Sequence, residues 1–312
     1  MSLPMILNLG QTALELALFN ALTVLALFLS YSMLNVCDLS TDGCFTLGAA
    51  TGAVVAIAGH PWLSIPAAMG AGMLSGLVTA TLQTRMGVNS LLAGIIVNTG
   101  LYSVNIWIMG GSSLLNMNRT GTVFTMLKEG LKGSFLASQY ALVIGLVAVT
   151  AVIVFLTLFL RTRLGLAIRA TGDNPDMVRS SSIDPVFTTT VGLCISNSFT
   201  ALSGCLLAQS QKSVDVNIGS GMVTVALASL LIGGVFLGKH SIPLRAIGAV
   251  LGAFVFRLVY TIALRFNLPA FMLKLISSVI VVIAISGPYI RRQIPIYRRR
   301  IAARFNEGRV KP

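Results

Sequence analysis

The sequence predicts an all-α membrane protein, a polytopic helical bundle of roughly nine spans with broken helices and an inverted repeat. Of its 312 residues 55% are apolar and only 10% are charged, and the mean hydropathy is +0.87. Soluble domains carry about 25% charged residues. The second observation is that apolar runs of helical length recur along the chain, and about 20 such residues cross the hydrocarbon core.

Nine apolar windows are the expected helices. They lie at residues 12–34, 44–59, 62–82, 90–110, 139–160, 186–208, 222–238, 243–263 and 267–287. The windows 44–59 and 222–238 are short and glycine-rich and adjoin polar sequence, so these two predict the broken helices. Because the N-terminal residues lack a basic region and a cleavage site, the first window is expected to be a retained span. Residues 1–290 form the predicted membrane domain, followed by a basic tail, 291–312.

Charge placement predicts the orientation. Most of the 22 Lys and Arg residues fall in four segments, residues 83–89, 161–185, 239–245 and the tail. Because cytoplasmic loops carry excess positive charge, these segments and the carboxyl terminus are expected inside, and nine spans then place the amino terminus outside. Acidic lipids at the inner surface explain the tail most simply. The net charge of +13 therefore needs no nucleic acid partner.

The two short windows follow related polar stretches that end in glycine and lead into small residues. This similarity predicts an inverted repeat, and chance similarity of two Gly- and Ala-rich segments is the alternative. The first stretch carries Asp38 and Asp42, and a charge at bilayer depth costs about 2.5–3.5 kcal/mol. One interpretation is that Asp42 caps the helix starting at Cys44, and the other is that both carboxylates belong to a translocation path.

The window 90–110 carries a polar stripe. Asn98, Tyr102 and Asn105 follow helical spacings of four and three and therefore share one face. Such a stripe should turn away from lipid, toward neighbouring helices or toward a water-filled path. Interhelical hydrogen bonding and path lining both remain open for these residues.

The segment 161–185 is the longest polar stretch predicted inside the cell. Asn174 or Asp173 before Pro175 predicts a capped helix start, so residues 175–182 are expected to form a short surface helix bearing Asp176, Met177 and Arg179. A short exposed helix is suited to docking into a groove on another protein. A simple connecting loop is the alternative.

Other chemistries have little support. Residues 233–239 approach the phosphate-binding pattern G-x4-G-K, but His240 replaces the required hydroxyl residue and no strand precedes them. Gly233 and Gly234 are expected to allow close helix packing instead. His60 and His240 are predicted on opposite faces, which excludes a shared metal site. The four cysteines lack metal-ligand spacing and are expected to be packing residues.

Two stretches resemble a known family. TRLGLAIRATGDNPDMVRSSSIDP at 162–185 resembles the cytoplasmic coupling segment of permeases in the branched-chain amino acid, ribose and nucleoside group of ATP-binding cassette importers, and DLSTDGCFTLGAA at 38–50 resembles their early motif. The DLS and DG residues, with LLAGIIVNTGLYSVNIWIMG at 91–110, resemble a subgroup of tryptophan or tyrosine permeases. The similarity covers about residues 10–290.

The resemblance implies a transport subunit of the bacterial cytoplasmic membrane that is not itself an enzyme. It implies a homodimer of permease chains, ATPase subunits that hold ATP and Mg²⁺, and an extracytoplasmic solute-binding protein, with no cofactor in this chain. The solute is expected to be an amino acid, aromatic or branched-chain, with a sugar or nucleoside as the alternative. ATPase coupling falls to Gly172, Asp173, Asn174, Pro175, Asp176, Met177 and Arg179.

Two other function classes remain. In an ion-coupled secondary transporter, Asp38, Asp42, Arg257 and Lys274 would be the coupling charges. A membrane enzyme would need a nucleophile with a base, and no serine or cysteine has an obvious partner. Snorkelling toward the interface is the simpler interpretation of Arg257 and Lys274. The expected path residues are Asn98, Tyr102 and Asn105, followed by Asp38 and Asp42.

Overall fold

The computed structural model describes residues 3–130, 139–237 and 241–264, together with residues 275, 278–283 and 286. The elements, in chain order, are α1 (Leu3–Leu27), the π-helical turn η1 (Phe28–Met33), α2 (Thr41–Ile57), α3 (Ser64–Thr84), α4 (Ser90–Ile108), β1 (Leu114–Asn116), α5 (Val123–Gly130), α6 (Tyr140–Phe159), α7 (Arg163–Asp173), α8 (Pro175–Ser180), α9 (Pro185–Gln211), β2 (Ser213–Asp215), α10 (Met222–Leu237) and α11 (Ile242–Leu264). The protein is a polytopic helical membrane protein, as the composition predicts.

Six of the described helices are long and apolar enough to cross a membrane, and α2 and α10 are shorter apolar helices. Eight of the nine predicted windows therefore coincide with helices. The ninth window, 267–287, lies mostly outside the described residues, so the count of nine is not confirmed. The amphipathic α5, the helix α7 and the two short strands were not predicted, because each is too short or too polar to register as an apolar window.

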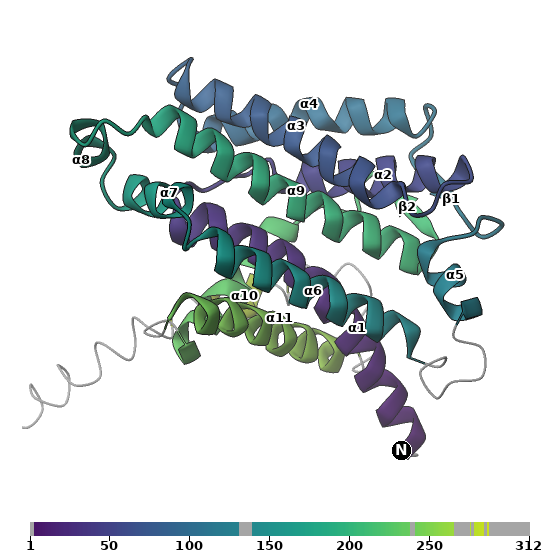
Figure 1. The fold of residues 1–312 in the computed structure, drawn as a ribbon. Coiled ribbons are helices and arrows are strands. Elements are labelled where there is room, and N and C mark those ends of the chain that lie inside the picture. Colours follow the sequence, from purple (N-terminus) through teal and green to yellow (C-terminus); the bar gives the residue numbers. More distant parts are fainter. Residues whose placement is uncertain are drawn as a thin grey trace, which may run out of the picture.

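The helices lie roughly side by side and their ends gather at two poles (Figure 1). One pole holds α7 and α8. The other holds the start of α1, α5 and the antiparallel pair β1–β2, in which Leu115 lies opposite Val214. The amino-terminal end of α1 is thus at the pole opposite α8, which is the relation that the predicted orientation requires.

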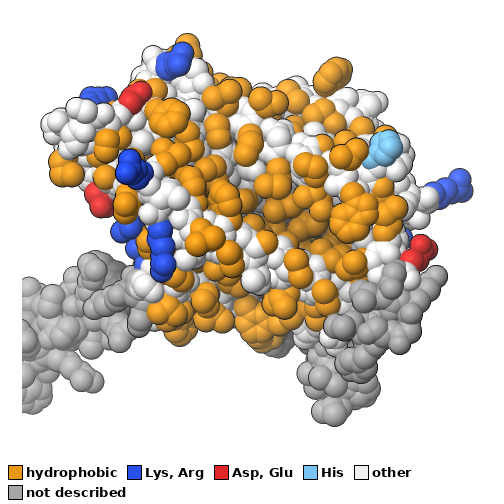
Figure 2. All heavy atoms as spheres, viewed as in Figure 1, with side chains coloured by type: hydrophobic (Ala, Val, Ile, Leu, Met, Phe, Trp, Pro, Cys, Tyr) orange, Lys and Arg blue, Asp and Glu red, His pale blue; other side chains and the backbone are white. Residues whose placement is uncertain are grey.

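The surface also differs between the middle of the bundle and the pole of α7 and α8. Figure 2 shows hydrophobic side chains across the middle of one face and a group of Lys and Arg side chains at the pole of α7 and α8. The central helices α1 and α9 bury most of the residues of their most apolar stretches, whereas α3, α4, α6 and α11 bury 33% or less of theirs. An apolar exposed band is what a lipid environment requires, because hydrocarbon is as apolar as the side chains it meets.

The two short helices start close together and run toward opposite poles. Gly48 and Gly52 of α2 lie against Ala201 and Cys205 of α9, so α2 runs parallel to α9 toward the strand pole. The helix α10 runs the other way and packs on α11, where Gly233 leaves room for the backbone of Gly248. Close packing at Gly233 is confirmed, while Gly234 faces open space.

Candidate functional site

The first turn of α2 is the point where the polar residues of the membrane domain meet. We call this region the α2 junction and define it as residues 38–46 with the side chains and backbone groups that contact them. It joins α2 to α3, α4, α9 and α10. The helix begins here because η1 ends at Met33 and Asn35 adopts a left-handed backbone (φ 57°), which turns the chain away from the α1 axis.

Asp38 lies at the centre of the junction and is 1% exposed. Its carboxylate accepts hydrogen bonds from the backbone N–H of Ser40 at 2.8 Å and from Nδ2 of Asn197 at 2.9 Å. The Ser40 hydroxyl accepts a further bond from Thr79 Oγ1 on α3 at 3.2 Å. The Asp38 carboxylate thus ties the start of α2 to α9, and the Ser40 hydroxyl ties it to α3.

Asp42 connects α2 to the other short helix. Its two carboxylate oxygens accept the backbone N–H groups of Gly221 and Val223, each at 2.8 Å. These N–H groups belong to the start of α10, where the helix dipole favours a negative charge. Thr46 adds a bond by accepting the N–H of Gly219 at 3.2 Å. The prediction that Asp42 caps the helix containing Cys44 is therefore wrong: Asp42 caps α10, and the N-cap residue of its own helix is Ser40.

Two of the three predicted residues of α4 also reach the junction. Asn105 is 1% exposed, and its Nδ2 donates to the carbonyl of Gly43 at 3.1 Å. Its Oδ1 has no hydrogen-bond partner among the described residues. The Oδ1 of Asn98 lies against Gly43, 2.7 Å from where a Cβ would stand, so residue 43 has no room for a side chain.

Tyr102 behaves differently and is 49% exposed. It shares an exposed polar face of α4 with Thr99 and Ser103, so the predicted stripe is split between a buried and an exposed part. Asn98 and Asn105 face α2, and Tyr102 faces outward. Helical spacing alone could not separate them, because the three positions lie within about 60° of one another around the helix.

Sequence reasoning missed Asn197, which is completely buried and links α9 to Asp38. Its backbone carbonyl also accepts the Cys44 thiol, with a sulfur–oxygen distance of 3.2 Å. The available signal was the cluster of the polar residues Ser196, Asn197, Ser198 and Thr200 in the middle of an apolar window, because polar groups at bilayer depth must find partners.

The pole opposite the strands carries the predicted coupling segment. Asn174 caps α8 by accepting the N–H groups of Asp176 and Met177, each at 3.1 Å, and Pro175 occupies the first helical position. Asp173 is instead the last residue of α7. The surface helix is confirmed, although it ends at Ser180 rather than at residue 182. Asp176, Met177 and Arg179 are exposed, while Val178 is buried and anchors the helix.

Gly172 has a different place from the other predicted coupling residues. It lies within α7, against the backbone of Met33 and Leu34, where any side chain would collide with main-chain atoms. Gly172 therefore cannot be replaced without disturbing how α7 packs on the end of η1. Its role is to let the coupling segment pack closely on the end of α1.

The charges of the ion-coupled hypothesis do not form pairs in the described part of the chain, where Arg179 and Asp176 make the one ion pair within 4.0 Å. The guanidinium of Arg257 lies 5.1 Å from the ring centre of Tyr260, and Lys274 lies outside the described residues. His240 and the tail 291–312 also lie outside them.

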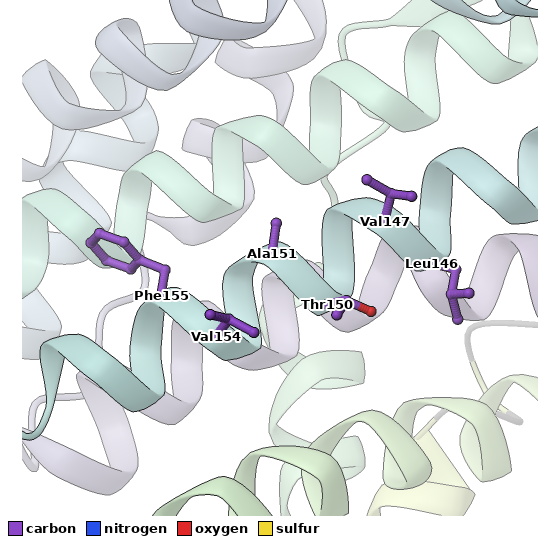
Figure 3. A pocket seen from close by; sticks show the side chains of 6 residues that line it. All are labelled: Leu146, Val147, Thr150, Ala151, Val154 and Phe155. Atoms are coloured by element: carbon purple, nitrogen blue, oxygen red, sulfur yellow. The ribbon is translucent and has the colours of Figure 1, made fainter.

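A shallow groove of about 540 Å³ lies along α6, lined by Leu146, Val147, Thr150, Ala151, Val154 and Phe155 (Figure 3). All six side chains come from one helix and nearly all are apolar. None of the predicted path residues lines this groove, which suits a lipid chain better than a polar solute.

Residues 12–285 match the family described as "Branched-chain amino acid transport system / permease component". The chain belongs to this family of ATP-binding cassette transporter permeases. The permease is 31% identical over 267 residues to a tyrosine transport system permease protein of Clostridioides difficile. The aligned region covers 85% of this chain and 86% of the relative. It is 27% identical over 252 residues to a fructose import permease protein of Bifidobacterium longum, covering 75% and 67%.

An uncharacterized protein of Rickettsia prowazekii is 30% identical over 287 residues, covering 90% of the permease and 98% of the relative. No solved structure gives a significant match. The permease is thus a transmembrane transport subunit with amino acid and sugar permeases among its relatives. Membership of the family implies an ATPase partner and a binding protein, and the apolar helices fit a multi-pass inner membrane protein.

Proposed function

We propose that the permease imports an amino acid, aromatic or branched-chain, across the bacterial cytoplasmic membrane, driven by ATPase subunits that bind ATP and Mg²⁺. The observation that carries the ATP-driven mechanism is α8, a capped and anchored helix that projects three exposed side chains from one pole of the bundle. The similarity to a tyrosine permease over 85% of the chain supports the solute class.

In this proposal α8 docks in a groove of the ATPase. Asn174 and Pro175 fix the start of the helix, and Asp176, Met177 and Arg179 provide the contacts. Met177 is 56% exposed, which is unfavourable for a large apolar side chain unless a partner covers it. Closure of the ATPase pair on ATP would then push α8 together with α7. The predicted orientation, with α8 and the carboxyl terminus in the cytoplasm and the basic tail on acidic lipids, is part of this proposal.

The translocation path is proposed to lie between two copies of the permease. Thr99, Tyr102 and Ser103 form an exposed polar face in the middle of a spanning helix, and such a face is disfavoured against lipid. A second copy facing it would enclose a weakly polar path. Asp38, Asp42 and Asn105 act behind this face by fixing α2 and α10, because each is hydrogen-bonded to backbone groups or to a buried side chain there. Asn98 also lies behind the face, against Gly43.

A sugar is the second candidate solute, since the fructose permease of Bifidobacterium longum is also similar to this chain. The ion-coupled hypothesis is less favoured because the partners of Asp42 are neutral backbone N–H groups and those of Asp38 are a backbone N–H and an amide.

The test is uptake by proteoliposomes that hold the permease with its ATPase and are supplied with its binding protein. Labelled tyrosine, tryptophan, leucine and fructose are offered separately, with and without internal ATP. Accumulation of an amino acid only with ATP supports the proposal. Accumulation of fructose but of no amino acid would overturn the solute class, and accumulation without ATP would overturn the mechanism.

A further inference from the structure

The chain leaves α1 through a π-helical turn, and this turn packs against the coupling segment. After α1 ends at Leu27, the chain continues directly into the π-helical turn η1, and the next N–H groups reach far back, from Leu34 to the carbonyl of Leu29 at 3.1 Å and from Val36 to that of Ser30 at 2.9 Å. π-Helical turns are rare and are frequent at functional sites, and this one ends the helical run that begins with α1. It places the following loop directly beside α7.

Two glycines form the seat. Gly172 of α7 lies against the backbone of Met33 and Leu34, so α7 and the end of α1 touch main chain to main chain. The Leu34 side chain, 3% exposed, fits between the helices α7 and α9: its Cδ2 lies 3.1 Å from the ideal Cβ position of Gly192, and Ile168 belongs to the same buried cluster. The contact leaves little free space, so a displacement of α7 must displace Leu34.

The far side of η1 is held by a different helix. Nη2 of Arg245, at the start of α11, donates to Ser32 Oγ at 2.7 Å, and its guanidinium lies 5.7 Å from the ring centre of Phe28. The π-helical turn therefore contacts α7 of the coupling segment and also the start of α11.

Only three residues separate Leu34 from Asp38. Asp38 holds Asn197 and the start of α2, and Asp42 in the next turn caps α10. We propose, on the basis of the proposed function, that Leu34 in its glycine seat is the positioning contact through which α8 and α7 move the α2 junction. The direct continuation of α8 into α9 is the competing route, because Asp184 caps α9 and Thr171 Oγ1 is bonded to Thr188 Oγ1 at 2.8 Å.

The test uses the complete complex with its ATPase and binding protein in proteoliposomes. The Leu34→Ala variant removes the contact, and Gly192→Ala is the second variant, whose methyl displaces the Leu34 side chain. The matched controls are Leu25→Ala, a buried leucine of α1 outside the route, and Gly145→Ala, whose methyl would meet Leu18 Cβ at 3.0 Å. Amounts of folded complex are equalised before each measurement.

The first readout is the number of solute molecules taken up per ATP hydrolysed. Both route variants should lower this ratio by roughly 2- to 30-fold, the range that a coupling contact typically contributes. The two controls should leave it unchanged even where they lower the yield, since a purely structural defect reduces uptake and hydrolysis together. An unchanged ratio in Leu34→Ala and Gly192→Ala would overturn the proposal in favour of the α9 route.

The second readout is the native thiol of Cys37, which is half-buried and lies between Leu34 and Asp38. Its alkylation by N-ethylmaleimide is followed by peptide mass spectrometry with and without ATP trapped by vanadate. We expect the rate to change by several-fold on trapping in the wild type and to be insensitive to trapping in Leu34→Ala. ATP-driven uptake with no change at Cys37 would overturn this inference alone, whereas absence of ATP-driven uptake in the wild type would overturn the proposed function.

Discussion

Asp42 is the residue that joins the two short helices, and its energetic value follows from its surroundings. Both of its oxygens accept backbone N–H groups of α10 in a largely buried site. Hydrogen bonds to a charged group contribute about 1.5–3 kcal/mol each, and leaving a buried donor without a partner costs about 1–3 kcal/mol. The start of α10 therefore depends on this carboxylate more than an exposed helix depends on its cap.

The first prediction follows directly. Asp42→Asn keeps one acceptor but loses the charge and leaves one backbone N–H without an acceptor, so it should destabilise the permease by about 1–3 kcal/mol. Asp42→Ala should destabilise it further. The measurement is the thermal unfolding midpoint in detergent, which shifts by roughly 2–4 °C per kcal/mol. Asp215→Asn is the control, because Asp215 accepts the N–H of Asn217 in an exposed turn. Equal shifts in the Asp42 and Asp215 variants would contradict the inter-helix cap.

A second prediction separates Tyr102 from Asn105. Tyr102→Ala should lower uptake while leaving the unfolding midpoint nearly unchanged, because the exposed ring contacts little in the isolated chain. Asn105→Ala should lower the midpoint, since it leaves the Gly43 carbonyl without its bond. Unfolding in detergent and uptake in proteoliposomes are measured on both variants. Normal uptake in Tyr102→Ala would remove this residue from the proposed path.

Among the helices, the starts that depend on residues within one turn were the ones predicted correctly from the sequence. The Asn174–Pro175 pair predicted the start of α8 correctly, because a cap and a proline act within one turn. The contacts of the α2 junction could not be predicted in this way. Asp42 lies far from Val223 in sequence and Asp38 lies far from Asn197, so each pairing depends on how α2, α9 and α10 pack. The π-helical turn has no sequence signature comparable to a cap.

The helix α8 gives a third prediction. Met177→Asp places a charge on the exposed tip without touching the core and should reduce both stimulated ATP hydrolysis and uptake by tenfold or more, about 1.4 kcal/mol of docking free energy. The yield and unfolding midpoint of the permease should stay as in the wild type. Val178→Asp is the matched comparison, since this neighbour is 1% exposed and its charge should prevent folding. Full ATPase stimulation by Met177→Asp would remove the docking role of α8.

Over the whole molecule, α8 is the proposed docking site of the ATPase, and the α2 junction lies beside the proposed translocation path. The short helices leave the junction toward opposite poles, which is the geometry that the predicted inverted repeat requires. The exposed polar face of α4 lies beside the junction, and α8 projects from the pole where Lys and Arg gather (Figures 1 and 2). A force applied at α8 thus has a continuous set of packed contacts to the helices that border the proposed path.

Whether ATP hydrolysis or an ion gradient drives transport is measured by comparing two proteoliposome preparations. One contains the permease alone with imposed proton and sodium gradients, and the other contains the permease with its ATPase, ATP and the binding protein. We expect solute accumulation in the second preparation and none in the first. Gradient-driven accumulation by the permease alone, at the rate of the full complex, would contradict this expectation.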